Sequence, residues 1–385
     1  MLQKVIKNLI VIGSIWFLSI GCGGVTALSA LGTVGSAAAT KAIEHTAGYG
    51  IQSPHTIISK VMPSVVTVSV ELKQPLPNTA RRFVKPGEPI EPIIPAPREN
   101  QYAAGSGFVF HEDGYVVTNW HVIRNAINNP SIIRIGFSNY AQYEATVFNY
   151  DAISDLAILK IKNEEGKKFP AVEWGDKPRL GGHAIIIGSP IGLDFSVSFG
   201  IISAVDRTIV RASPPFVPYV QTDAAMNRGN SGGPLFNADG EVIGINTLIL
   251  SPSPSQEAGG SIGLGFAIDG QYAQNIIRRL ANGEQIKWSY LGVHYRLLDR
   301  NETKHNNLEF GENVIIVKVT KDGAAFGKLK ENDIVQKLNG EIARHTNFAT
   351  IISQLPPGTV VKMEVLRNGK VIEVEIELME RPKGP

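Results

Sequence analysis

Short apolar segments separated by turn-forming residues dominate the chain from residue 105 to residue 268. They are rich in Val, Ile, Leu and Phe, and β-branched and aromatic residues favour extended strands. The predicted strands are 107–110, 115–118, 132–137, 145–150, 156–161, 184–188, 197–204, 219–222, 242–250 and 264–268. Many short strands joined by glycine-rich turns predict a β-barrel or a β-sandwich.

A strand and a helix bound this β region. Residues 61–72 alternate and are rich in Val, which predicts the first strand, whereas residues 73–100 hold seven prolines and predict an irregular loop. At the other end, Asp269 suits a helix N-cap and Gly283 a C′ position. The apolar positions 272, 276, 277 and 280 between them lie on one helical face. The predicted domain spans residues 61–284.

A second, smaller unit covers residues 288–380. Its predicted strands are 314–319, 334–338, 360–366 and 371–378, and helical stretches are predicted at 324–329 and 348–355. The sequence Pro356-Pro357-Gly358 marks a turn. About 90 residues of mixed elements predict one small α+β domain.

The first 40 residues predict export from the cytoplasm. Lys4 and Lys7 precede an apolar run at residues 9–20, and no charged residue occurs from position 8 to position 40. This pattern is typical of a signal or an anchor and keeps the two lysines in the cytoplasm. Three fates fit: an uncleaved inner-membrane anchor, cleavage near residues 36–39, or lipidation of Cys22. Residues 41–60 then form a polar spacer.

Charge and cysteine content narrow the classes of function. The 37 Lys and Arg nearly balance the 35 Asp and Glu, and the formal net charge is +2. A nucleic-acid binder usually carries a marked basic excess, so nucleic acid is not an expected partner. A single cysteine excludes an intramolecular disulfide and a cysteine-based zinc site. The chain has no HExxH and no GxxxxGK[ST] motif, so no metal and no other cofactor is predicted.

The segment Gly229-Asn230-Ser231-Gly232-Gly233 holds the candidate nucleophile. Flanking glycines let the backbone turn sharply, expose the Ser231 hydroxyl and bring N–H groups close to a substrate oxyanion. The segment matches the G-x-S-x-G nucleophile elbow, but that motif needs a helix after the serine and an acid and a histidine downstream. Here more strand follows, and the downstream histidines lie in the smaller unit.

A histidine and an acid precede the serine instead. His121 follows a predicted strand, and Asp155 begins an apolar one. The order His121, Asp155, Ser231 is that of chymotrypsin-like barrels. In that arrangement His121 is the general base, Asp155 fixes its tautomer, and the oxyanion site is formed by Gly229, Asn230 and Ser231 through the N–H groups of Gly229 and Ser231.

Each of these residues also has an ordinary structural interpretation. Taken by itself, Ser231 could be a turn residue, Asp155 could cap the end of a strand, and His121 could be a structural histidine. Asp151 and Asp223 compete as the acid, but the apolar residues 156–159 favour a buried Asp155. His111 and His183 lack such surroundings and are interpreted as structural or surface residues.

Together these motifs resemble those of the HtrA/Deg family of trypsin-like serine proteases with a C-terminal PDZ domain. The matching stretches are 105–108 (GSGF), 118–122 (TNWHV), 155–160 (DLAILK), 221–225 (QTDAA), 229–235 (GNSGGPL), 244–247 (GINT) and 263–268 (GLGFAI). The resemblance covers roughly residues 55–380. Trp120 and Arg228 depart from it, since Asn or Tyr is commoner before the histidine and Pro is common before Gly229. Because proline would stiffen that loop, we expect a protease that a ligand must activate.

The resemblance implies a mainly β fold, a chymotrypsin-like double β-barrel protease domain followed by a small α+β PDZ domain. It further implies an ATP-independent serine endopeptidase of the cell envelope, in the periplasm and membrane-anchored, that cleaves misfolded or regulatory proteins. Homotrimers are expected.

The resemblance also suggests two binding sites. Ala225, Met226, Ile245 and Asn246 are expected to line the substrate pocket and to favour a small aliphatic residue before the cleaved bond, with the loops 183–194, 209–219 and 248–262 shaping the cleft. In the PDZ domain, Tyr290, Leu291, Gly292 and Val293 resemble a loop that binds C-terminal carboxylates, and Asp333 and Gly340 match its later pattern. The alternative is a catalytically silent PDZ scaffold that binds protein C-termini.

Overall fold

The computed structural model describes residues 53–72, 102–163, 165–189, 195–208, 216–249 and 261–382. The predicted export segment at residues 1–40 and the predicted proline-rich loop at 73–100 lie outside these ranges. Within the described residues, no helix combines the length and the apolar character that a membrane crossing requires.

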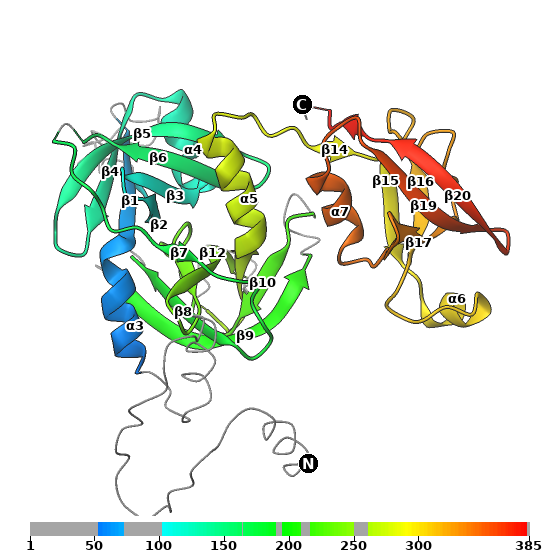
Figure 1. Ribbon diagram of the computed structural model, residues 1–385, viewed down its shortest axis with the longest axis horizontal. Coiled ribbons are helices and arrows are strands. Elements are labelled where there is room, and N and C mark those ends of the chain that lie inside the picture. The colour runs from blue at the N-terminus through cyan, green and yellow to red at the C-terminus, as the bar shows by residue number, and fades with distance from the viewer. Residues whose placement is uncertain are drawn as a thin grey trace, which may run out of the picture. The chain divides into compact units, whose positions relative to one another are not determined.

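Six antiparallel strands close into a first barrel (Figure 1). They are β1 (Val65–Leu72), β2 (Tyr102–His111), β3 (Tyr115–Asn119), β4 (Ser131–Phe137), β5 (Gln142–Asp151) and β6 (Leu156–Ile161), in the order β1-β2-β3-β6-β5-β4. Because side chains alternate along a strand, Val66, Val68 and Val70 share the barrel interior and Val65 contributes to a different core. A helix, α4 (Trp120–Asn128), follows β3 directly.

A second closed ring of strands follows. Its members are β8 (His183–Gly188), β9 (Ser196–Arg207), β10 (Tyr219–Thr222), β11 (Pro234–Phe236), β12 (Glu241–Ile249) and β13 (Gly265–Asp269), and the short β7 (Glu173–Trp174) adds to β12 in parallel. The order is β11-β8-β9-β10-β13-β12, and the β11–β12 pairing closes the ring. The structure therefore confirms the mainly β fold and both barrels, and the predicted strands in this region match observed ones.

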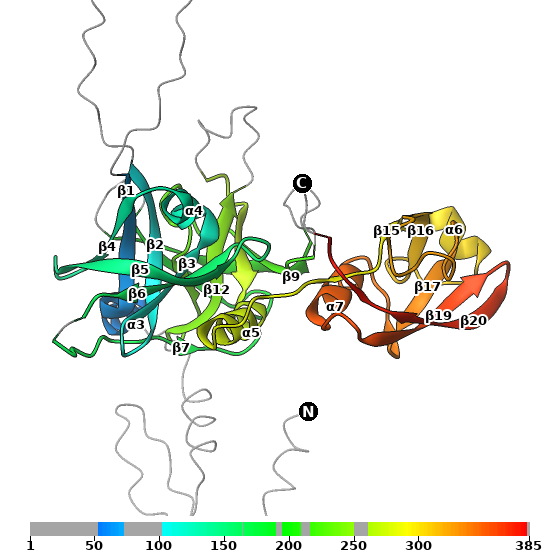
Figure 2. The same ribbon diagram turned by 90° about the horizontal axis from the view of Figure 1, so that it is seen from above.

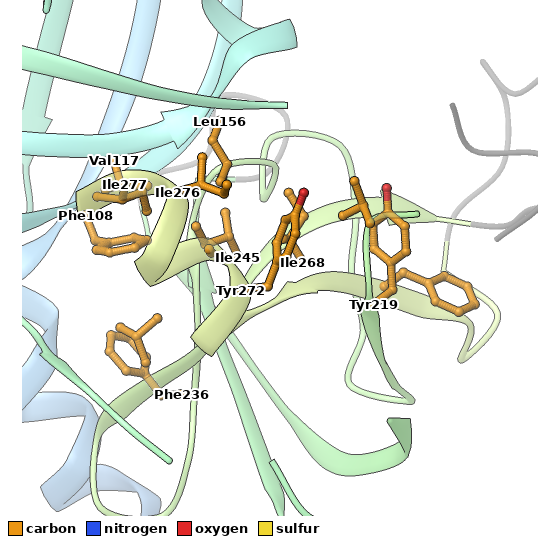
Figure 3. Close-up of a cluster of buried hydrophobic side chains, with 14 of the residues drawn as sticks. Phe108, Val117, Leu156, Tyr219, Phe236, Ile245, Ile268, Tyr272, Ile276 and Ile277 are labelled. Atoms are coloured by element: carbon orange, nitrogen blue, oxygen red, sulfur yellow. The ribbon is translucent and has the colours of Figure 1, made fainter. Parts of the chain in front are cut away.

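A shared core joins the two barrels. Phe108, Val117 and Leu156 of the first barrel belong to the same buried cluster as Ile245 and Ile268 of the second (Figure 3). Helix α5 (Gly270–Ala281) contacts strands of both barrels, β5 and β6 of the first and β12 and β13 of the second. Figure 2 shows α5 beside β12.

Helix α5 has the predicted boundaries. The Asp269 side chain accepts the Tyr272 N–H at 3.0 Å, and Gly283 has the positive φ of 80° that a C′ glycine supplies. Its apolar face is buried at Tyr272, Ile276, Ile277 and Leu280.

The start of the protease fold differs from the sequence prediction. Residues 41–60 were expected to be a spacer, and a strand was expected from residue 61, but Pro54–Val61 is helix α3 and Met62–Ser64 a 3₁₀ turn, η1. Ile57 and Val61, one helical turn apart, bury themselves in the inter-barrel core. Pro54 occupies the first helical position, where its missing N–H costs nothing.

The C-terminal domain has its own sheet and core. Strands β15 (Val293–Leu297), β16 (Val314–Val319), β17 (Ile334–Leu338), β19 (Val360–Arg367) and β20 (Lys370–Glu377) are adjacent in that order, with β18 (Glu341–Ile342) paired to β17. The short strands β14 (Ser289–Tyr290) and β21 (Met379–Glu380) pair separately, and the helices are α6 (Arg300–His305) and α7 (Phe348–Gln354). The helix predicted at 324–329 is wrong, because these residues form turns and Gly327 has a φ of 78°.

Candidate active site

One carboxylate holds the candidate histidine at two points. Asp155 Oδ2 lies 2.7 Å from Nδ1 of His121, and Asp155 Oδ1 accepts the backbone N–H of the same residue at 2.8 Å. An ionised carboxylate only accepts hydrogen bonds, so the neutral imidazole carries its proton on Nδ1 and leaves Nε2 as an acceptor. The side chains are 36% and 21% exposed, which keeps His121 accessible and its partner largely shielded.

The backbone around Asp155 is fixed as well. Its φ is 57°, a left-handed conformation that Asp tolerates better than most residues. The Asp155 carbonyl accepts the Trp120 N–H at 3.1 Å and the Asn119 side-chain amide at 2.9 Å. Asp155 is thus bonded to the end of β3 and to the first turn of α4, where His121 lies.

Ser231 lies in a tight loop that contacts the same strand end. A Cβ on Gly232 would lie 2.8 Å from the Asn119 backbone nitrogen and would also meet Thr118 Oγ1 and Ser106 O, so only glycine fits. Hydrogen bonds join the loop to the first barrel, from Ser106 N–H to the Ser231 carbonyl at 2.8 Å, and to the second, from Gly232 N–H to the Asn246 carbonyl at 2.8 Å. The loop therefore places Ser231 beside the β3 end that leads into His121.

Two N–H groups of this loop remain available. The N–H groups of Gly229 and Ser231 donate to no acceptor in the described part of the chain. The Asn230 N–H, by contrast, donates to the Asn227 carbonyl at 3.1 Å, so of the three residues predicted for the oxyanion site, Gly229 and Ser231 are the two whose N–H groups have no acceptor among the described residues. Gly229 needs glycine, because its φ is 93°.

Ser106 supports the loop and was not assigned a role from the sequence. Its hydroxyl donates to the Gly229 carbonyl at 2.6 Å and accepts the Ser189 N–H at 3.0 Å. It is wholly buried. The GSGF motif at 105–108 was the available signal, but the motif alone does not reveal a partner 123 residues away.

The Ser231 hydroxyl and the His121 ring make no hydrogen bond to each other in this conformation. Catalytic hydrogen bonds are often long until a substrate is bound. The arrangement thus has a formed acid–histidine pair, and the Ser231 loop is hydrogen-bonded to the first barrel through Ser106.

The competing residues lie elsewhere. Asp223 accepts the Ile201 N–H at 2.7 Å on β9, and His111 pairs with Asp113 at 3.5 Å on an exposed turn. His183 packs against the ring of Phe199, with ring centroids 5.3 Å apart. Asp151 is buried near Asp155 but contacts Ser154 and Trp288 rather than a histidine.

Buried tyrosines stay neutral beside the acidic residues. Burial raises the pKa of Tyr219, and the charge of Asp155 adds to the effect. Burial likewise raises the pKa of Tyr272, with a contribution from Asp151.

The expected pocket residues differ in accessibility. Ala225 is exposed, and its carbonyl accepts the Ser198 hydroxyl at 2.6 Å. Met226 is 2% exposed, in contact range of Gly265, and Ile245 is wholly buried in the inter-barrel core. Asn246 is also buried, and its amide donates to the Pro234 carbonyl at 2.9 Å. Ile245 thus supports the site from the core, and parts of the three expected cleft loops lie outside the described residues.

In the predicted carboxylate loop of the C-terminal domain, two backbone carbonyl groups accept hydrogen bonds from elsewhere in the domain. The Gly292 carbonyl accepts from the Thr320 N–H at 2.8 Å and hydroxyl at 3.0 Å, and the Leu291 carbonyl accepts the Ala325 N–H at 2.9 Å. The N–H groups of Leu291 and Gly292 find no acceptor among the described residues. Tyr290 and Val293 flank them at the ends of β14 and β15.

Comparison with known proteins agrees with this organisation. Residues 105–245 match a trypsin-like peptidase domain, and residues 289–378 match a PDZ domain. A probable periplasmic serine endoprotease DegP-like of Pseudomonas putida (strain W619) is 34% identical over 348 residues, which cover 85% of this chain and 70% of the relative. The periplasmic pH-dependent serine endoprotease DegQ of Escherichia coli (strain K12) is 35% identical over 329 residues, covering 84% and 69%.

Solved structures show the same likeness. The HtrA-type protease AlgW with tripeptide superposes with a TM-score of 0.69 at 28% identity, covering 86% of this chain and 98% of that one. A serine endoprotease from Yersinia pestis gives a TM-score of 0.57 at 27% identity, covering 86% and 99%. Fold and relatives define a trypsin-like serine endopeptidase with one matched PDZ domain. The chain belongs to the HtrA/Deg family of serine proteases.

Proposed function

We propose that His121, Asp155 and Ser231 form the catalytic triad of this endopeptidase. The observation that carries the proposal is the pair of contacts between the Asp155 carboxylate and His121, 2.7 Å to ring Nδ1 and 2.8 Å to the backbone N–H, beside the Ser231 loop. An acid that fixes both the ring and its backbone orients Nε2 for proton transfer.

The reaction follows from these positions. Nε2 of His121 takes the proton of the Ser231 hydroxyl as the oxygen attacks the substrate carbonyl, and the Asp155 carboxylate stabilises the imidazolium. The N–H groups of Gly229 and Ser231 bind the oxyanion, an interaction that contributes about 10²–10³ in rate per donor. His121 then protonates the leaving amine, and a water molecule, activated in the same way, releases the acyl group.

The substrates and surroundings are also proposals. The relatives are named periplasmic, which supports a periplasmic enzyme, and the apolar N-terminal run supports an anchor in the inner membrane. The substrates are misfolded or regulatory envelope proteins, cleaved without ATP after a small aliphatic residue. Free N–H groups at Leu291 and Gly292 support binding of C-terminal peptides, which regulates a homotrimeric protease.

The test is proteolysis of casein by the wild type and by Ser231→Ala. We expect the variant to lose at least about 10⁴-fold in kcat. Ser131→Ala, a part-buried serine of β4, is the matched control and should keep full activity. Equal activity of wild type and Ser231→Ala would overturn the triad. Inactivity of the wild type towards casein and peptides, with retained binding of C-terminal peptides, would instead support the silent scaffold.

A further inference from the structure

The turn before Asp155 is closed by a second buried carboxylate. Asp151 is 9% exposed, and its Oδ2 accepts the Ser154 N–H at 2.6 Å. Ser154 is fully buried and directly precedes Asp155, whose φ is 57°. A residue in this sparsely populated conformation persists only when its surroundings hold it there.

The other oxygen of Asp151 is held by a tryptophan from far along the chain. Trp288 Nε1–H donates to Asp151 Oδ1 at 3.1 Å across 137 residues of sequence. Each oxygen of the carboxylate therefore accepts one N–H, and the two donors together fix its orientation.

Trp288 is itself firmly placed. It is 4% exposed, its ring lies 5.2 Å from Phe216 and 6.4 Å from Tyr272, and its carbonyl accepts the Arg381 N–H at 2.7 Å. It lies between the end of α5 and the start of β14, in the segment that joins the protease domain to the PDZ domain.

We propose that Asp151 is a positioning residue for the Asp155–His121 pair, and that Trp288 sets its orientation. Asp151 touches neither His121 nor a reacting atom, so it acts by holding the 151–155 turn that aims Asp155 at His121. This inference rests on the triad proposed above. The linker residue Trp288 thereby becomes part of the support of the catalytic acid.

The first test is Trp288→Phe, which removes the N–H donor and keeps an aromatic ring. We expect kcat on a short peptide to fall about tenfold, the scale of one hydrogen bond to a charged group, with KM unchanged because substrate contacts are untouched. Trp174→Phe is the matched control: this ring packs against the same core cluster, 5.7 Å from Phe108, and makes no hydrogen bond or ring contact with the 151–155 turn among the described residues. A kcat for Trp288→Phe equal to that of the control would overturn the proposal.

A second variant separates positioning from packing. Asp151→Asn has the same shape but offers only one acceptor and sets its amide NH₂ against the other N–H donor, so kcat should fall at least as far. In the double variant that combines Asp151→Asn with Trp288→Phe, the new amide faces no opposing N–H donor. We therefore expect its loss in kcat to be smaller than the product of the two single-variant losses. Multiplicative losses would contradict the link. If Trp288→Phe does not fold, a wild-type kcat in Asp151→Asn overturns the proposal. Retained activity of Ser231→Ala would refute the triad instead.

Discussion

Three residues at the proposed catalytic site have backbone conformations that few side chains tolerate. Gly229, Gly232 and Asp155 have φ values of 93°, 84° and 57°. Two are glycines, for which a positive φ carries no Cβ penalty, and the third is held by hydrogen bonds on both sides. The catalytic geometry thus depends on single residues whose replacement strains the backbone.

Gly232→Ala should therefore remove activity rather than merely lower stability. The new Cβ would meet the Asn119 nitrogen at 2.8 Å, in backbone that cannot move without disturbing the β3 end before His121. Overpacking of this kind costs about 1–3 kcal/mol, in addition to the strain of the positive φ. We expect at least a hundredfold loss of kcat on a peptide substrate.

Gly181→Ala is the control for this prediction. Gly181 also has a positive φ, 77°, but its Cβ would meet nothing within 4 Å. It should lose only the backbone strain, about 1–2 kcal/mol of unfolding free energy, and keep kcat. If the two variants behave alike in kinetics and thermal unfolding, close packing at Gly232 does not control the site.

At the scale of elements, apolar runs bounded by turn residues and helix-end signals were the reliable features of the sequence. Most of the longer strands were predicted from such runs, and α5 was predicted because its apolar positions share one face and Asp269 and Gly283 mark its ends. Strand β15 was not predicted. Helix α3 was missed although Pro54 and the pair Ile57 and Val61 carried its signal, since eight residues show little periodicity.

Contacts between distant elements could not be predicted. Proposed site residues were found because they lie in recognisable motifs, whereas the bond from Asp151 to Trp288 depends on how two elements pack. The same holds for the hydrogen bond from Ser106 to Gly229, because Gly229 lies in the loop between β10 and β11 of the other barrel. A sequence pattern defines an element, but the packing of elements selects which side chains meet.

Helix α6 gives a pH prediction at this scale. Asp299 and Glu302 form a capping box, and Glu302 also pairs with Arg296 at 2.6 Å. The Arg296 guanidinium, with the Asp299 N–H, lowers the pKa of Glu302 from 4.5 to about 2. Because the pKa of Glu302 is lower in the folded state than in the unfolded state, its contribution to the free energy of unfolding is complete above the unfolded-state pKa. This contribution is lost as pH falls from about 4.5 towards 2.

Two measurements check this expectation. Carboxyl NMR should show Glu302 titrating near pH 2. Glu302→Gln should lower the stability of the PDZ domain at pH 7 by up to about 1 kcal/mol, since Arg296 is half exposed, and the difference should shrink towards pH 3. Glu331→Gln, a carboxylate with no ion pair within the described ranges, is the control. An ordinary pKa for Glu302 would contradict the structure.

At the scale of the whole chain, the two domains have separate cores. The barrels share the cluster that contains Phe108, Ile245 and Ile276, whereas the PDZ core is built around Val314, Val335 and other residues of its own sheet. Domains with their own cores can unfold in separate transitions. We therefore expect a mutation in the PDZ core to lower one transition and leave the other in place.

Arg367→Met tests this independence. Arg367 donates through Nε and a terminal nitrogen to both oxygens of Asp333, each at 2.7 Å, and Asp333 is 1% exposed. Removing one partner leaves a buried charge unpaired, which costs about 3–5 kcal/mol. In a domain of this size that lowers the unfolding temperature by more than about 10 °C. Calorimetry of the full chain should show this shift in one transition only.

The control is Arg344→Met, which breaks the more exposed pair with Glu312 at 2.8 Å and should change the unfolding temperature of the PDZ domain little. A common shift of both transitions would show that the protease and PDZ domains unfold as one cooperative unit.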